Sequence, residues 1–137
     1  MIFPWRSNGM NAKVWLVDED VSLRESLGFL LKALDYDVAD FADLAAFDAA
    51  MTVQPPLRGC LLVNLSVPGM GWLTEQENRH PLLSVIIMTG QNTLEACRRA
   101  LGERAFAFYT KPLEIAPLLQ SVQQATQQSL QRVTQDR

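Results

Sequence analysis

The sequence has few of the features that mark metal-binding, secreted or membrane proteins. It contains two cysteines, Cys60 and Cys97, whose spacing fits neither a metal site nor a redox motif, so buried free thiols are expected rather than a disulfide. Its apolar runs fall far short of the roughly 20 residues that cross a bilayer. Residues 1–5 are too short for a signal-peptide core and contain a proline. A cytoplasmic protein is therefore expected.

The chain also lacks a strong charge of either sign and a glycine-rich phosphate loop. Its net charge of −3 gives no broad attraction to nucleic acid or to anionic membranes. No GxGxxG or GxxxxGKS/T motif occurs, which weighs against a nucleotide-binding protein. The 137 residues are 48% hydrophobic and 20% charged, as in a globular chain with one domain of ordinary size.

Short apolar segments alternate with helical patterns along the chain. Strands are predicted at residues 13–17, 38–41, 60–63, 83–88 and 105–109. Helices are predicted over residues 23–34, 43–51 and 93–101 and from residue 115, with Asp20 or Ser22 as the cap of the first and Asn92 as the cap of the helix that ends at residue 101. The pattern predicts an α/β fold, in which a five-stranded parallel sheet of order 2-1-3-4-5 carries helices on both faces. Its third helix, within residues 72–79, is shortened because Pro81 leaves room for at most two turns.

The two ends of the chain differ from its middle. Residues 1–11 carry Pro4 and Gly9 without periodicity, which indicates a flexible arm, and the domain itself is expected over residues 12–125. In the last helix the apolar stripe then thins among many glutamines. Residues 126–137 are therefore predicted to form a helical extension or linker that projects from the domain body.

Polar residues follow four of the predicted strands. They are Asp18 and Glu19 after the first, Asn64 after the third, Thr89 after the fourth and Lys111 after the fifth. The carboxyl ends of parallel strands meet at one edge of the sheet, where open α/β sheets place their sites. Each residue alone reads as an ordinary cap or surface residue, but the combination indicates a functional site.

These residues and their surroundings resemble the receiver domain of two-component response regulators. The matching stretches are residues 14–20, 62–64, 68–70, 88–90 and 108–112, and the resemblance covers about residues 12–125. The spacing from Thr89 to Lys111 is similar to that of receivers that precede helix-turn-helix output domains.

The resemblance implies a role for each site residue. Asp18 and Glu19 would hold Mg²⁺, with Ser66 as a third residue of a weak metal site, and the residue at position 64 would accept a phosphoryl group from a histidine kinase. Thr89 and Lys111 would then bind the phosphoryl oxygens. Phe108, with Tyr109 beside it, would signal to the face formed by the helix at 93–101, the fifth strand and the last helix. The Lys111–Pro112 peptide bond is expected to be cis.

The sequence departs from the family at the centre of this chemistry, because the acceptor position is Asn64. A carboxamide offers no anionic oxygen for attack on phosphorus, and Mg²⁺ depends heavily on carboxylates. Gly71 follows Met70 at once, the next helix is short, and Asp35 replaces the usual glycine after the first helix. Because a single laboratory substitution would not shorten a helix, natural divergence is favoured.

We therefore expect a pseudo-receiver that is not an enzyme and holds no cofactor, or only weak Mg²⁺. Its partner would be a protein such as a sensor kinase or an output domain, or a second copy in a homodimer through the face just described, with no nucleic acid and no membrane. One alternative is a phosphorylatable receiver, with an engineered Asp-to-Asn change at Asn64 or with another acceptor, of which Ser66 is the nearest in sequence. A small α/β nucleotide or flavin binder is the less favoured alternative.

Overall fold

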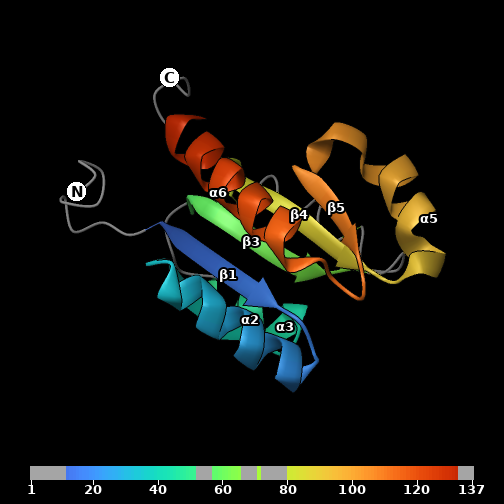
Figure 1. Ribbon diagram of the computed structural model, residues 1–137. Coiled ribbons are helices and arrows are strands. Elements are labelled where there is room, and N and C mark those ends of the chain that lie inside the picture. Colours follow the sequence, from blue (N-terminus) through green and yellow to red (C-terminus); the bar gives the residue numbers. More distant parts are fainter. Residues whose placement is uncertain (1–11, 52–56, 66–70, 72–79, 133–137) are drawn as a thin grey trace.

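The computed structural model describes residues 12–51, 57–65, 71 and 80–132 and shows the expected parallel sheet of order β2-β1-β3-β4-β5 (Figure 1). Its strands are β1 (Lys13–Val17), β2 (Asp37–Phe41), β3 (Gly59–Asn64), β4 (Leu83–Thr89) and β5 (Ala107–Thr110). The helices of the described part are α2 (Val21–Ala33), α3 (Leu44–Met51), α5 (Gln91–Leu101), the short 3₁₀ helix η2 (Gly102–Arg104) and α6 (Ile115–Arg132). The predicted short helix in residues 72–79 lies outside the described residues.

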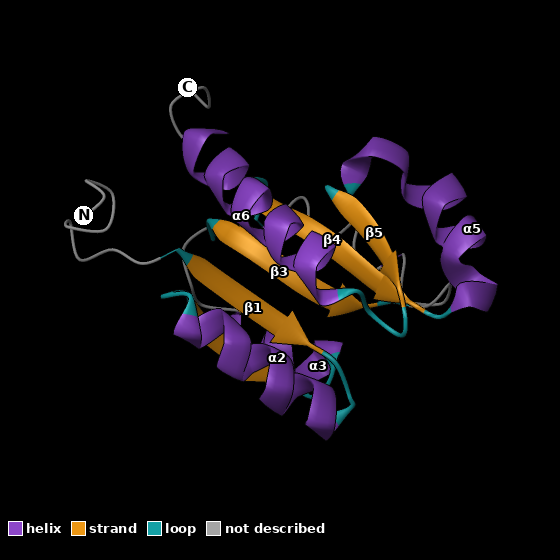
Figure 2. Ribbon diagram, viewed as in Figure 1, coloured by secondary structure: helices purple, strands orange, loops and turns teal. Residues whose placement is uncertain are grey.

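Helices cover both faces of the sheet, as predicted (Figures 1 and 2). Leu27 of α2 and Leu118 of α6 belong to the apolar core on one face. Phe47 of α3 and Leu101 of α5 belong to the core on the other. The central strands β3 and β4 are therefore buried from both sides, which explains why their sequences are continuous apolar runs rather than alternating ones.

The strand register places the expected site at one edge of the sheet. Val17, the last residue of β1, pairs with Val63 of β3, and Asn64 pairs with Met88 of β4. Thr89 pairs with Thr110, the last residue of β5. The polar residues that end these strands are thus neighbours across the sheet.

The helix starts are partly as predicted. Asp20 caps α2, because its carboxylate accepts a hydrogen bond from the Leu23 amide at 3.3 Å. The prediction of Asn92 as a cap is wrong. The helix α5 begins at Gln91, directly after β4, with Gly90 at the cap position and no side-chain cap. Asn92 consequently lies exposed inside the first turn.

The last helix stays on the sheet further than predicted, so the expected departure from the domain body after residue 125 is wrong for the described part of the helix. Thr126 and Ser129 are both buried. The Ser129 hydroxyl accepts a hydrogen bond from the Gly59 amide at 2.6 Å and donates one to the Leu82 carbonyl at 2.5 Å. Because small hydroxyl residues make this contact, a search for apolar periodicity could not reveal it.

Replacing Ser129 with alanine is expected to lower the free energy of unfolding by about 1–3 kcal/mol, since a buried N–H and C=O would lose their partner. Urea denaturation measures the change. Gln127→Ala, at an exposed position of the same helix, is the control and should leave stability nearly unchanged. Equal stability of both variants would show that the Ser129 contacts do not hold α6.

The two cysteines are free and buried. Burial raises the pKa of the Cys60 thiol far above its ordinary range, so this thiol stays protonated and unreactive. No helix in the described part of the chain is long and apolar enough to cross a membrane.

Candidate functional site

Asp18 is the centre of the site and its side chain is fully buried. It follows β1, where its own amide donates to the Phe41 carbonyl at 3.1 Å and so ties it to the end of β2. Its Oδ1 accepts a hydrogen bond from the Asp20 amide at 2.9 Å. The Arg24 guanidinium donates to its carbonyl oxygen at 2.8 Å. Asp18 is therefore held on both its backbone and its side chain.

Lys111 completes the bonding of the Asp18 carboxylate. Its backbone amide donates to the Thr89 carbonyl at 3.0 Å, which brings the end of β5 beside the end of β4. Its Nζ lies 2.6 Å from Oδ2 of Asp18, and 28% of its side chain is exposed. The Lys111–Pro112 bond is cis, as expected. The ammonium thus pairs with the residue after β1.

Asn64 ends β3 beside this pair and is half-buried. It lines a hollow of about 310 Å³ together with Asp18, Glu19 and Asp43. The remaining walls come from Val17, Ala42, Leu44 and Ala45. Three carboxylates therefore border this hollow, but Lys111 neutralises that of Asp18. Within the described residues, the Asn64 carboxamide has no hydrogen-bond partner.

The donor set does not fit a magnesium ion. Mg²⁺ requires near-octahedral oxygen ligands and relies on carboxylates. Both carboxylate oxygens of Asp18 are already engaged, one by an amide and the other by an ammonium group. Asn64 contributes no charge, and the described residues hold no group of three or more His, Cys, Asp or Glu side chains arranged for a metal.

Thr89 is buried at the end of β4, and its hydroxyl is hydrogen-bonded to the hydroxyl of Thr93. Thr93 in turn donates to the Gly90 carbonyl at 3.1 Å. The family resemblance implies that the Thr89 hydroxyl binds a phosphoryl oxygen. In this structure the same hydroxyl is bonded to Thr93 of α5 instead. Thr93 was not predicted in this role, although its position four residues after Thr89, one helical turn on, is a signal for such a contact.

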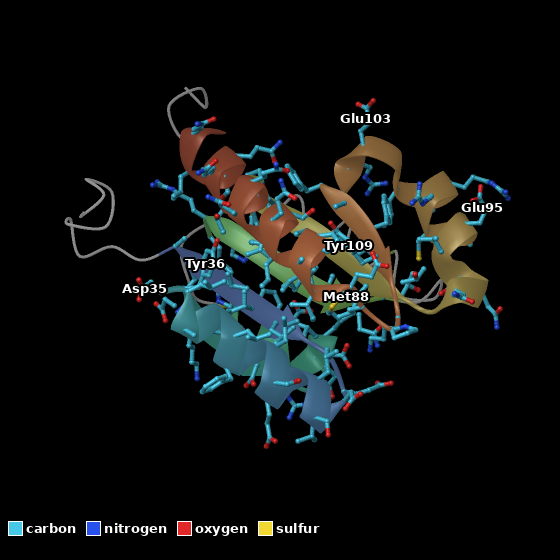
Figure 3. The ribbon with its side chains drawn as sticks, viewed as in Figure 1. Asp35, Tyr36, Met88, Glu95, Glu103 and Tyr109 are labelled. Carbon is cyan, nitrogen blue, oxygen red and sulfur yellow. The ribbon has the colours of Figure 1, made fainter. Side chains whose placement is uncertain are left out.

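The two aromatic residues of β5 point to opposite faces of the sheet. Phe108 packs against the core under α3 and α5, and the Arg98 guanidinium lies 5.8 Å from its ring centroid. Tyr109 lies between β5 and α6 (Figure 3), where its hydroxyl donates to the Pro117 carbonyl at 3.0 Å and bonds the Ser121 hydroxyl. Neither aromatic belongs to the site around Asp18.

The structure thus brings Asp18, Lys111, Asn64 and Glu19 to one edge, with Thr89 joined to Lys111 through the backbone. Ser66 and the residues 68–70 of the expected pattern lie outside the described residues. Arg24 and the β2–α3 side of the hollow were not predicted. Arg24 reaches the Asp18 carbonyl from α2, and the residues after β2 reach the hollow because β2 pairs with β1.

Comparisons with known proteins agree with this geometry. Residues 14–123 match the family model of the response regulator receiver domain. Nodulation protein W of Bradyrhizobium diazoefficiens is 28% identical over 95% of this chain, and the transcriptional regulatory protein FixJ of Azorhizobium caulinodans is 30% identical over 90%. Full-length FixJ from B. japonicum is similar in structure, with a TM-score of 0.75 and 26% identity, over 86% of this chain and 59% of that one. The chain spans 60% and 59% of the lengths of the two curated relatives.

Proposed function

Because the chain belongs to the response regulator receiver domain family of two-component signalling, we propose that it is a pseudo-receiver. In this role it transmits a signal through protein contacts and accepts no phosphoryl group at Asn64. It is not an enzyme on this account, and it needs no resident cofactor.

The observation that carries the proposal is the pairing of Lys111 with Asp18 beside Asn64. Phosphoryl transfer to a side chain needs a nucleophile, and the carboxamide of Asn64 has no anionic oxygen to supply. The ammonium that would stabilise a phosphoryl group lies 2.6 Å from the Asp18 carboxylate. The Asp18 carboxylate and the Lys111 ammonium therefore satisfy one another without a phosphoryl group.

The hydroxyl bond between Thr89 and Thr93 supports the same proposal. A switch that depends on phosphorylation needs a threonine whose hydroxyl is free to form a hydrogen bond with the phosphoryl group. Here the Thr89 hydroxyl is already bonded to α5, and the Arg98 guanidinium lies near Phe108 from the same helix. We infer that the protein presents one preset conformation of its α5–β5–α6 surface to a partner.

The proposed partner is a sensor kinase or an output domain, bound at the surface that α5, β5 and α6 form together. Arg98 and Arg99 of α5 are exposed there, with Glu95 beside Arg99 at 3.7 Å. The outer residues of α6 are mainly glutamines. This surface offers both charged and amide groups for a specific protein contact.

The proposal is tested by incubating the protein with acetyl phosphate and Mg²⁺ and measuring its intact mass. The mass should remain unchanged, whereas Asn64→Asp serves as the control that can gain a phosphoryl group. A stoichiometric gain in the unaltered protein would contradict the proposal. If peptide mapping placed that gain on Ser66, the receiver would use a different acceptor.

A further inference from the structure

The sequence contains one histidine, His80, and it is buried at the amino edge of the sheet. The residue is 2% exposed and lies just before β4. Its Nδ1 accepts a hydrogen bond from the amide of Leu57, which lies just before β3, at 2.9 Å. Its carbonyl accepts one from the Leu83 amide at 3.2 Å. His80 therefore joins the segments that enter the two central strands, at the edge opposite the site around Asp18.

The hydrogen bond from Leu57 sets the charge of the His80 ring. A backbone amide can only donate, so Nδ1 must supply its lone pair, and the ring proton must lie on Nε2. Protonation would put a second N–H on Nδ1, directed at the Leu57 N–H. It would also charge a group that is shielded from water. The contact between His80 and Leu57 therefore exists only with a neutral ring.

Charged residues on the surrounding elements do not alter this conclusion. They are carried by β1, α3, the segment before β3, η2 and α6, and they are Lys13, Asp48, Arg58, Glu103, Arg104 and Arg132. The carboxylates among them are Asp48, which is half-buried, and Glu103, which is exposed. A carboxylate near the ring would favour the imidazolium and a cation would oppose it. In either case a protonated Nδ1 cannot accept the Leu57 amide.

A second side chain joins the same two segments, two residues further along each of them. The Ser129 hydroxyl of α6 accepts a hydrogen bond from the Gly59 amide at 2.6 Å and donates one to the Leu82 carbonyl at 2.5 Å. The end of α6 lies over the start of β3 (Figure 1). His80 and Ser129 thus hold the entry to β3 together. Release of Leu57 would leave Ser129 to hold this entry without His80.

We propose that the contact between His80 and Leu57 is an acid-sensitive switch, in which protonation of His80 frees Leu57, loosens the entry to β3 and weakens the attachment of the end of α6. The closed state excludes the proton and the open state binds it, so acid favours the open state. An exposed histidine takes up a proton below about pH 6.5. The contact is therefore fully formed above that pH and is lost as the pH falls below it. This inference goes beyond the proposed function and holds whether or not Asn64 accepts a phosphoryl group.

Amide hydrogen exchange of the whole chain, measured by NMR between about pH 7.5 and pH 5.5, tests the inference. The protection factor of the Leu57 amide should fall about tenfold over this range, because an exposed imidazole takes up its proton there. The Gly59 amide should lose protection with it, since its partner is Ser129. The Asp20 amide, which bonds Asp18 at the opposite edge, should change by less than about twofold, because carboxylates stay ionised at these pH values.

His80→Asn is the matched variant, because the carboxamide oxygen can accept the Leu57 amide close to the position of Nδ1 but does not titrate. Its Leu57 protection factor should not depend on pH in this range. The ring nitrogen chemical shifts of the unaltered protein are a second readout, and near pH 7.5 they should show a neutral ring with its proton on Nε2.

Four results would overturn the inference. A ring proton on Nδ1 would contradict the contact itself. A constant Leu57 protection factor in the unaltered protein, or an equal fall in His80→Asn, would mean that His80 does not control it. An equal fall at Asp20 would show that acid weakens the whole fold and not the amino edge. A fall at Leu57 with Gly59 unchanged would contradict the coupling to α6.

Discussion

Replacing Lys111 with methionine is expected to lower the free energy of unfolding by about 2–4 kcal/mol. The Asp18 side chain is fully buried, and Lys111 is its ionic partner at 2.6 Å. Removing the ammonium leaves a buried carboxylate with only the Asp20 amide as a side-chain partner among the described residues. The loss stays below that of a fully buried pair because 28% of the Lys111 side chain is exposed.

Lys13→Met is the matched control, because Lys13 pairs with Asp37 at 3.1 Å on the surface, where 34% and 58% of the two side chains are exposed. This loss should be at most about 1 kcal/mol. Urea denaturation of both variants measures the difference. Asp18→Asn in the Lys111→Met background should recover part of the lost stability, since it removes the buried charge. Equal losses in the two lysine variants would mean that the Asp18–Lys111 pair does not stabilise the site.

Restoring the family's acid with Asn64→Asp is expected to destabilise the metal-free protein. A new carboxylate would join those of Asp18, Glu19 and Asp43 around the hollow, and the Lys111 ammonium is already paired with Asp18. Like charges ~4 Å apart repel by about 1–4 kcal/mol at effective dielectric constants of 80 to 20. Added Mg²⁺ should offset much of this loss in the variant, since a ligand of the native state stabilises it by mass action.

Thermal unfolding near neutral pH, with EDTA and with millimolar Mg²⁺, measures both effects. Asn92→Asp makes the same chemical change at an exposed position of α5 and should respond to Mg²⁺ no more than the unaltered protein does. If the unaltered protein gained as much from Mg²⁺ as Asn64→Asp, then Asn64 would not have disabled the metal site, and the charge argument would be wrong.

Periodicity predicted the strands and helices, and the rule of right-handed crossovers together with the commonest five-strand topology predicted the sheet order and the edge that carries the site. Apolar runs ending at Asp18, Asn64, Thr89 and Lys111 mark strand ends, and parallel strands bring their carboxyl ends together. The cis bond before Pro112 followed from the family resemblance.

The pairing of individual atoms could not be predicted in this way. Lys111 forms an ion pair with Asp18, and Thr93 forms a hydrogen bond with the Thr89 hydroxyl. Both contacts depend on side-chain geometry at one edge of the sheet. Ser129 likewise holds the end of α6 through hydroxyl bonds to backbone groups, which have no apolar periodicity. The Asn92 cap failed because α5 begins directly after β4, without a loop.

The measurement that tests the central claim most directly is the NMR response of the site to a beryllium fluoride mimic of the phosphoryl group with Mg²⁺. In the unaltered protein, the backbone amide signals of Asn64, Thr89 and Lys111 should keep their positions, because no acceptor carboxylate is present and Lys111 stays paired with Asp18. In Asn64→Asp the same signals should shift. Shifts of equal size in the unaltered protein would contradict the pseudo-receiver account.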